Sequence, residues 1–475
     1  MYNNIQEFYN TLPLVIIAIG ILISTTIEMY SKKSENYLSW FSILIFLASG
    51  FYSLLTLDNR SVILQNMLAT GGYVNIFYFV FSFSAAIISF LSIDYLKKYD
   101  AYFGEYYILL QTSVLGMMFM AGAKDLFMIF LGLEVMSVSF YVLAGINRKR
   151  LTATESALKY FLLGAFATGF VVYGIALIYG TAQSTSFDVI AFKFSKLSGN
   201  LLFLSGVLLF LIGFSFKIAA FPFHMWVPDV YQGAPSTIAG LFSTAGKVAA
   251  FSAIIVSLFV LFTSGAMKII TPYLSVISVL SMFFGSIVAI AQTNIKRMLA
   301  YSSISHAGYL IIGLAASNTS GIAGIIFYLA AYSFMNLGAF GIVSLVEGKE
   351  ESNLELNSYR GLGTRQPLLA ALLSLFMFSL AGIPPFAGFF GKYYIFIAAI
   401  EAKLTWLAIL GVLSSVISVY FYLRLVVLMY FYDSSDEFEI AKSNTGLLAV
   451  FISAILVVLL GVLPGTLLNL ITSYL

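Results

Sequence analysis

Ionisable side chains interrupt long apolar stretches of this sequence at five places. These residues are Glu134, Lys159, Lys217, Lys247 and Lys392. At the centre of a bilayer each such charge costs about 2.5–3.5 kcal/mol, so five unpaired charges would cost on the order of 12–18 kcal/mol. That sum exceeds the net stability of a typical domain, about 5–15 kcal/mol. The five groups must therefore be paired or hydrated inside a bundle.

Four of these five residues are lysines, which suit proton transfer. A lysine amine releases its proton more readily when it is taken out of water, whereas a nearby carboxylate holds the proton in place. A Glu–Lys pair that opens and closes would therefore load and unload a proton on the next lysine. We predict that Glu134 pairs with Lys217, that Lys247 is the central carrier and that Lys392 is the terminal one. Spacing alone does not establish the pairing.

Each of these residues also has a plainer interpretation. Lys159 begins its apolar stretch beside Glu155, and it could snorkel to the membrane surface instead. For the other four residues the alternative is a structural ion pair. His224 and His306 are isolated histidines, for which a hydrogen-bonding role competes with a role as proton relay.

The composition indicates the elements that must position these groups. The chain is 60% hydrophobic and 9% charged, whereas a soluble domain carries roughly 25% charge. Apolar runs of about 20 residues recur throughout, each long enough to cross a bilayer. We therefore predict an all-α integral membrane protein with about fourteen transmembrane helices. The predicted spans are 12–30, 38–57, 74–96, 106–122, 125–145, 157–180, 200–222, 236–262, 272–293, 298–316, 321–346, 367–399, 404–431 and 446–471.

Two of these spans are predicted to be broken. Pro222 interrupts span seven, and Pro384 and Pro385 interrupt span twelve. Proline frees backbone carbonyls that cannot face lipid, so both breaks should line an enclosed or hydrated cavity. Polar residues cluster near both breaks, as expected of half-channels.

A weak internal repeat accompanies the breaks. Tyr141 and Tyr309 are 168 residues apart (309 − 141), and so are Tyr160 and Tyr328 (328 − 160). Units of five helices must insert with opposite topology, and matching broken helices mark ion pathways in such proteins. We predict an N-terminal three-helix segment (1–105), two inverted five-helix repeats (106–262 and 263–431), and a C-terminal loop with the last helix (432–475).

The loop charges predict an orientation. With both termini on one side, basic residues on the opposite side outnumber those on the terminal side by about two to one, which places the termini outside the cell. The opposite side carries Lys32, Lys33, Lys97, Lys98, Arg148, Lys149, Arg150, Lys296, Arg297, Lys349, Arg360, Arg365 and Lys442, and the terminal side carries Arg60, Lys124, Lys193, Lys196, Lys268 and Lys403.

The sequence also excludes several kinds of chemistry. It has no cysteine and only two histidines, which removes thiolate metal sites, Fe–S clusters and histidine-rich metal centres. It contains neither a Rossmann fingerprint nor a phosphate-binding loop. Any redox chemistry would belong to a partner.

Three segments resemble signatures of the antiporter-like membrane subunits of respiratory complex I. They are FKIAAFPFHMWVPDVY at 216–231 with the following Gly233-Ala234-Pro235, NIKRMLAYSSISHAGY at 294–309, and Gly382 to Pro385 continuing through Gly391-Lys392. The resemblance runs across nearly the whole chain. It implies a fourteen-helix fold with inverted repeats. It also implies a proton path that begins with a carboxylate–lysine pair in spans five and seven and continues through lysines in spans six, eight and twelve. Those positions fall on Glu134, Lys217, Lys159, Lys247 and Lys392.

The same resemblance implies proton translocation coupled to quinone reduction. NADH, FMN, Fe–S clusters and quinone are then expected in partner subunits, with no cofactor and no metal on this chain. The expected partners are the other membrane and peripheral subunits of the complex, including neighbouring antiporter-like subunits, in a bacterial inner membrane and without nucleic acid. The alternative is a subunit of a multisubunit cation/proton antiporter. A purely structural subunit would gain nothing from central charges.

Overall fold

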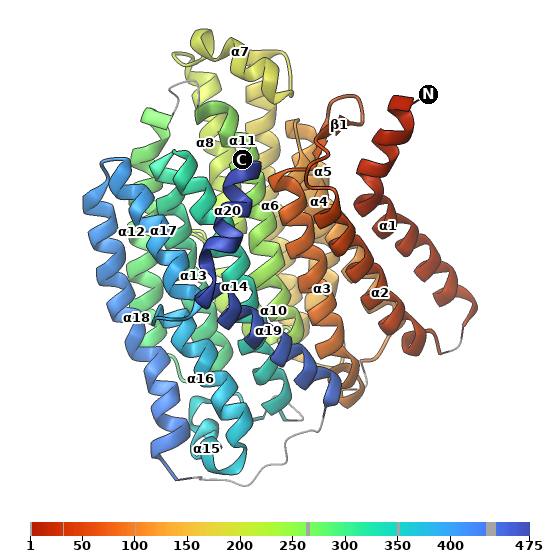
Figure 1. The fold of residues 1–475 in the computed structure, drawn as a ribbon, viewed down its shortest axis with the longest axis vertical. Coiled ribbons are helices and arrows are strands. Elements are labelled where there is room, and N and C mark those ends of the chain that lie inside the picture. Colours follow the sequence, from red (N-terminus) through yellow and green to blue (C-terminus); the bar gives the residue numbers. More distant parts are fainter. Residues whose placement is uncertain (1, 32, 100, 263–266, 349–351, 434–442) are drawn as a thin grey trace.

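The chain folds into a bundle of long helices that run roughly side by side (Figure 1). The computed structural model describes residues 2–31, 33–99, 101–262, 267–348, 352–433 and 443–475. Three lysines counted in predicting the orientation lie outside the described residues: Lys32, Lys349 and Lys442. The predicted domain boundary after residue 262 and most of the loop that begins at 432 also lie outside them.

The long helices follow the predicted apolar spans closely. They are α1 (Tyr2–Tyr30), α2 (Ser34–Leu55), α3 (Tyr73–Lys98), α4 (Gly104–Gly122), α5 (Leu126–Ala144), α6 (Leu151–Ala182), α8 (Leu201–Lys217), α11 (Lys247–Phe262), α12 (Met267–Ile290), α13 (Ile295–Ala316), α14 (Thr319–Val346), α16 (Pro367–Ala381), α17 (Ala387–Glu401), α18 (Thr405–Phe431) and α19 (Asn444–Val462).

Eleven helices in the described ranges are long and apolar enough to cross a membrane. The apolar helices α8 and α16 are shorter, because each belongs to a broken span. The multi-span all-α class is therefore confirmed. The number fourteen stays a prediction, since it counts α4 and the two broken spans as crossings.

Short elements fill the connections. They are α7 (Phe187–Leu197), α9 (Trp226–Gly233), α10 (Ser236–Leu241), the π-helical turn η1 (Phe242–Gly246), the 3₁₀ turn η3 (Leu356–Tyr359), α15 (Leu362–Arg365) and α20 (Pro464–Tyr474). A small antiparallel hairpin, β1 (Ser61–Ile63) and β2 (Leu68–Thr70), joins α2 to α3. The sequence analysis did not predict this hairpin.

Two predicted spans are less regular than expected. The span 446–471 is not one helix, because α19 ends at Val462 and α20 begins at Pro464. Proline lacks the N–H that would continue the helix, so it starts a new one. The span 236–262 contains the π-helical turn η1 directly before Lys247.

The two predicted breaks are confirmed and have local causes. Helix α8 ends at Lys217, after which Ala219 adopts a left-handed backbone (φ 63°). Helix α16 ends at Ala381 and is capped by Gly382 (φ 88°). The Gly382 N–H donates to the carbonyls of Phe378 and Ser379. Glycine at this position ends a helix without a Cβ clash, and the prolines that follow cannot resume the hydrogen-bond ladder.

The core of the bundle lies around α14, whose residues from Gly321 to Val346 are all buried. The continuous segment formed by α10, η1 and α11 is also buried through Leu258. In contrast, α6 and α18 expose large apolar side chains such as Phe166 and Val416, as expected of helices at a lipid-facing surface. The buried helices are therefore the ones that carry Lys247 and the groups around it.

Both termini lie in the upper half of the bundle in Figure 1, whereas the loop between α1 and α2 and the turn containing α15 lie at the lower end. This arrangement agrees with the prediction that the termini share one side. Lys33 directly precedes α2, Lys98 ends α3, Arg360 follows η3 and Arg365 ends α15. We call the end of the bundle formed by these helix ends the basic-loop end.

Candidate proton-transfer site

Lys217 is held by hydroxyl groups of α5. Its Nζ donates to Ser137 Oγ at 2.8 Å and to Tyr141 OH at 3.3 Å, and the side chain is buried. Glu134, Ser137 and Tyr141 follow one another at helical spacing, so they share a face of α5. No hydrogen bond or ion pair joins Glu134 to Lys217 in the described part of the chain, although the two charges lie within electrostatic range. The predicted ion pair is therefore not formed in this structure; Lys217 bonds instead to Ser137, one helical turn along α5 from Glu134.

Lys247 opens α11 directly after the π-helical turn and reaches α13. Its Nζ donates to both the carbonyl oxygen and Oγ of Ser303, each at 2.5 Å. The same Nζ lies 5.1 Å from the ring centre of Tyr332 on α14. With 2% of its surface exposed, Lys247 is held entirely by protein groups.

Lys392 uses the second break as its acceptor site. Its Nζ donates to the carbonyls of Leu380 (3.2 Å) and Ala381 (2.9 Å) and to Ser415 Oγ (2.8 Å). The two carbonyls are the last of α16, which the broken helix leaves without internal donors. Three acceptors match the three donors of an ammonium group, and the negative end of the α16 dipole faces it.

His306 lies between Lys247 and Lys392 in a cluster of tyrosines. Its Nδ1 bonds to Tyr328 OH at 2.5 Å and its Nε2 to Tyr422 OH at 2.9 Å. The His306 ring is 4.9 Å from the Tyr332 ring, which contacts Lys247, and 5.7 Å from the Tyr309 ring. Tyr309 in turn lies 5.0 Å from Lys392 Nζ, measured to the ring centre. Ring contacts therefore connect Lys247 through His306 to Lys392, and we call this set the polar line; no hydrogen bond between described residues joins His306 directly to either lysine.

The segment between Lys217 and Lys247 is different, because it is built of aromatic rings. Tyr141 packs against Tyr160 (4.9 Å between ring centres), Tyr160 stacks on Trp226 (4.6 Å), and Tyr160 also contacts Phe242 (5.3 Å). Phe242 begins the π-helical turn that leads to Lys247. We call these four residues the aromatic layer. No hydrogen bond between described residues connects Lys217 to Lys247 across it.

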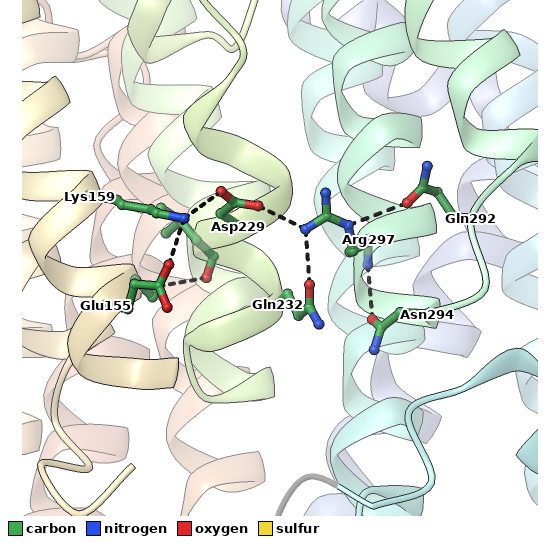
Figure 2. Close-up of polar contacts among 9 residues, drawn as sticks. Glu155, Lys159, Asp229, Gln232, Gln292, Asn294 and Arg297 are labelled. Atoms are coloured by element: carbon green, nitrogen blue, oxygen red, sulfur yellow. Dashed lines mark hydrogen bonds and ion pairs between the residues drawn. The ribbon is translucent and has the colours of Figure 1, made fainter. Parts of the chain in front are cut away.

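Lys159 belongs to a separate ionic network at the edge of the bundle (Figure 2). Its Nζ pairs with Glu155 (2.8 Å) and with Asp229 (2.9 Å), and Asp229 also pairs with Arg297 (2.8 Å). Lys159 keeps 42% of its side chain exposed. The network joins α6 and α9 to α13, and Gln232 and Gln292 also bond to Arg297. The structure therefore groups Lys159 with surface charges and not with the three buried lysines.

Charge governs the ionisation of Asp229, which lies on α9 outside the candidate spans. Burial disfavours its ionised form, but the hydrogen bonds and charges of Lys159 and Arg297 outweigh that effect and hold the pKa of Asp229 below its usual value. The carboxylate is thus a stable link between α6 and α13.

His224 occupies the first break. Only 6% of it is exposed, its ring lies 4.5 Å from the ring of Phe284 on α12, and its Nδ1 has no hydrogen-bond partner among the described residues. No hydrogen bond between described residues joins it to Lys217. Unlike His306, it is therefore not part of the polar line.

Several site residues were not predicted from the sequence. Ser303, Tyr332 and Tyr422 hold or contact the predicted groups, and Arg297 pairs with Asp229. The 168-residue offset singled out Tyr328, which forms a hydrogen bond with His306. That offset was the one sequence signal that pointed to this tyrosine cluster.

Comparison with known proteins is consistent with this geometry. A family model described as "NADH:quinone oxidoreductase/Mrp antiporter, TM" matches residues 123–418. The chain is 43% identical to NADH-quinone oxidoreductase subunit N 1 of Chloroherpeton thalassium over 98% of each chain. It is 41% identical to NADH-quinone oxidoreductase subunit N of Trichlorobacter lovleyi, again over 98% of each.

Solved structures share the fold. A chain of respiratory complex I from Thermus thermophilus with bound aureothin matches with a TM-score of 0.82 at 30% identity, covering 97% of this chain and 99% of that one. A chain of the Mrp complex from a Dietzia species matches with a TM-score of 0.88 at 18% identity, covering 98% and 97%, which shows the fold alone.

The fold and the buried lysines thus define a membrane protein of the ion-translocating class. The chain belongs to the family of antiporter-like membrane subunits of NADH:quinone oxidoreductases and Mrp antiporters. Within that family it is a member of the subunit N branch, to which both curated relatives belong.

Proposed function

We propose that this chain translocates protons as a membrane subunit of a NADH:quinone oxidoreductase, with Lys217, Lys247 and Lys392 as successive proton carriers. The observation that carries the proposal is that all three buried ammonium groups are held by hydroxyls and carbonyls, with no carboxylate in contact in the described part of the chain. A hydroxyl can accept from an ammonium and donate to a neutral amine, so these sites suit a group that changes its protonation.

The coupling step would be movement of Lys217 between Glu134 and the hydroxyls of Ser137 and Tyr141. When the ammonium swings to Glu134, its charge leaves the aromatic layer, and Lys247 is easier to protonate because the repulsion between the two cations falls. Return of Lys217 to Ser137 reverses the effect. His306 and its tyrosines then pass the proton between Lys247 and Lys392. Lys159 acts indirectly through its ion pair with Asp229, because its charge changes the electrostatic potential at the edge of the first repeat.

The proposal includes the surroundings of the chain. Partner subunits hold NADH, FMN, Fe–S clusters and quinone and carry out the electron transfer, while this chain and neighbouring antiporter-like subunits conduct protons. The termini face the outside of a bacterial inner membrane, and the basic-loop end faces the cytoplasm. The inverted repeats 106–262 and 263–431 form the two half-channels, preceded by 1–105 and followed by 432–475.

The test measures NADH oxidation and proton uptake together in inverted membrane vesicles that carry Lys217→Ala. We expect both rates to fall on the order of tenfold or more, because a proton carrier of the path is lost. Lys196→Ala is the matched control, since Lys196 is exposed on α7 and outside the site. Assembly of the complex is verified on native gels. Full pumping by an assembled Lys217→Ala complex would contradict the proposal.

The competing function is cation/proton exchange without redox chemistry. The curated relatives at about 40% identity carry names of the oxidoreductase, whereas the Mrp structure shares the fold at 18% identity. Sodium-driven proton exchange by the wild-type protein, without NADH-driven pumping in the same vesicles, would replace the redox-coupled proposal with the antiporter.

A further inference from the structure

A completely buried carboxylate lies at the basic-loop end, apart from the lysine path. Glu347 follows the last residue of α14, and its side chain is completely buried. Its Oε2 accepts hydrogen bonds from Tyr95 OH on α3 (2.9 Å) and from Ser236 Oγ at the start of α10 (2.6 Å). Its Oε1 lies 3.5 Å from Nη1 of Arg150, directly before α6. Four helices thus converge on one carboxylate.

The charges around Glu347 come from the loops that face the basic-loop end. Lys98 Nζ donates to the Glu347 carbonyl, and Tyr99 OH donates to the next carbonyl, that of Gly348, at 2.7 Å. The titratable and charged groups that face Glu347 are Tyr95, Lys98, Tyr99, Arg150 and Tyr359. Two basic groups, Lys98 and Arg150, therefore lie beside this buried carboxylate.

Polar groups continue from Glu347 toward Lys247. Asn336 lies 11 residues before Glu347, about three helical turns or roughly 16 Å, and Tyr332 lies one further turn away. The three side chains therefore share one face of α14. Asn336 Oδ1 and Tyr332 OH are fully buried and make no well-formed hydrogen bond to a described residue, although the Tyr332 hydroxyl interacts with Asn336 and Ser303. Tyr332 is the residue whose ring contacts Lys247.

Helix α10, which packs directly on α14, adds a third such group. Thr237 follows Ser236, which bonds to Glu347; the Thr237 Oγ1 is also buried, makes no well-formed hydrogen bond to a described residue, and interacts with the Tyr106 hydroxyl. Tyr106 lies nearby and bonds to Ser92 at 2.6 Å. Buried polar atoms in natural proteins are normally satisfied, and where no side chain does so, water does.

On these contacts we propose that Glu347 takes up protons at the basic-loop end and that Thr237, Asn336 and Tyr332 line a hydrated path from it to Lys247. The proposal rests on the proposed function of the lysine path. It assigns Lys247 a supply of protons that does not cross the aromatic layer. The plain alternative is that Glu347 only ties α3, α6, α10 and α14 together.

Glu347→Gln tests the proton role in complexes that assemble, because an amide oxygen still accepts from Tyr95 and Ser236 but cannot exchange a proton; it also loses the ion pair with Arg150, so assembly is verified first. In the assembled complex we expect proton uptake and NADH oxidation to fall on the order of tenfold or more, with partial recovery in Glu347→Asp. The matched control is Glu105→Gln, which removes an exposed charge in the first turn of α4 at the same end of the bundle. Unchanged pumping by assembled Glu347→Gln overturns the proposal.

Thr237→Val tests the path even if Glu347→Gln does not assemble. The change keeps the side-chain shape and removes only the interaction of the Thr237 hydroxyl with Tyr106. We expect a severalfold loss of pumping with assembly intact, and an unchanged pumping rate overturns the proposal. Loss of pumping in Lys217→Ala with normal pumping in assembled Glu347→Gln rejects Glu347 alone, whereas normal pumping in assembled Lys217→Ala rejects the proposed function itself.

Discussion

The amine of Lys217 donates a 2.8 Å hydrogen bond to Ser137 Oγ, one helical turn along α5 from Glu134, and makes no ion pair with that glutamate in the described structure. Glu134 and Ser137 share a face of α5, and Lys217 on α8 bonds to the serine and not to the glutamate. We predict that the amine alternates between these two groups. This prediction makes Glu134 the first target for mutation.

Glu134→Gln should uncouple the first step while leaving Lys217 in place. The amide has no charge to attract the ammonium, so Lys217 stays on Ser137 and Tyr141, and we expect NADH oxidation and pumping to fall on the order of tenfold or more. Glu401→Gln, an exposed change at the end of α17, is the control. Wild-type pumping by Glu134→Gln would show that the pair does not act as a switch.

Tyr422→Phe should weaken both the structure and the relay around His306. The hydroxyl bonds to His306 Nε2 at 2.9 Å and to Ser302 Oγ, so its removal leaves buried polar atoms unsatisfied. We expect a loss of about 1–3 kcal/mol in stability, seen as a lower temperature of thermal inactivation, together with slower pumping. Tyr420→Phe, which alters an exposed ring on the same helix, should change neither.

Asp229→Asn should destabilise the contact between α6 and α13. We expect the loss of Tm to vary with salt concentration but not with pH near neutrality. The pKa of Asp229 is lowered in the folded protein, so its contribution is complete above the unfolded value of about 3.9 and is lost only as the pH falls through the still lower folded value. The difference in Tm from wild type should therefore stay constant from about pH 5.5 to 8.

The same difference should shrink at high salt, because the pairs of Asp229 are partly exposed. Asp188→Asn, at the exposed pair with Lys124, is the control for loss of a surface charge. A Tm difference that changes steeply between pH 6 and 8 would contradict the assignment of the charge to Asp229.

Gly388→Ala should disrupt the second break. A Cβ at Gly388 would lie 1.8 Å from the Ser379 carbonyl oxygen, so α17 would have to move away from the end of α16. We expect a loss of about 1–3 kcal/mol or more, with poor assembly on native gels. Gly169→Ala is the matched change, because nothing lies within 4 Å of its Cβ on α6. It should be neutral or slightly stabilising.

The sequence predicted the helices and the breaks well, because both depend on local chemistry. Apolar runs define the spans, and Pro222, Pro384 and Pro385 lie just beyond the ends of α8 and α16, where they cannot resume the hydrogen-bond ladder. Proline is not a universal stop, since Pro13 and Pro272 lie inside α1 and α12. Pro464 also starts a new helix, although the predicted span 446–471 runs through it without a break. The hairpin of β1 and β2 gave no comparable signal, since each of its strands is three residues long.

The partners of the charged residues were harder to predict, because helical spacing defines a face but not the helix that packs on it. Lys247 was expected in the path, yet its ligand Ser303 lies 56 residues away on α13. Glu347 follows an apolar run directly, where a charge usually marks the membrane surface. Only the convergence of α3 and α10 on its carboxylate shows that it is buried.

The aromatic layer also has a consequence for energy storage. A membrane potential drives each proton back with about 2.3 kcal/mol per 100 mV, so an unbroken row of hydroxyls from one face to the other would discharge the gradient. Tyr160, Trp226 and Phe242 offer no hydrogen-bonded bridge between Lys217 and Lys247 in the described structure. We expect the stacked rings to hinder proton movement between Lys217 and Lys247, so that the side chains that pack the fold also limit leakage of the gradient.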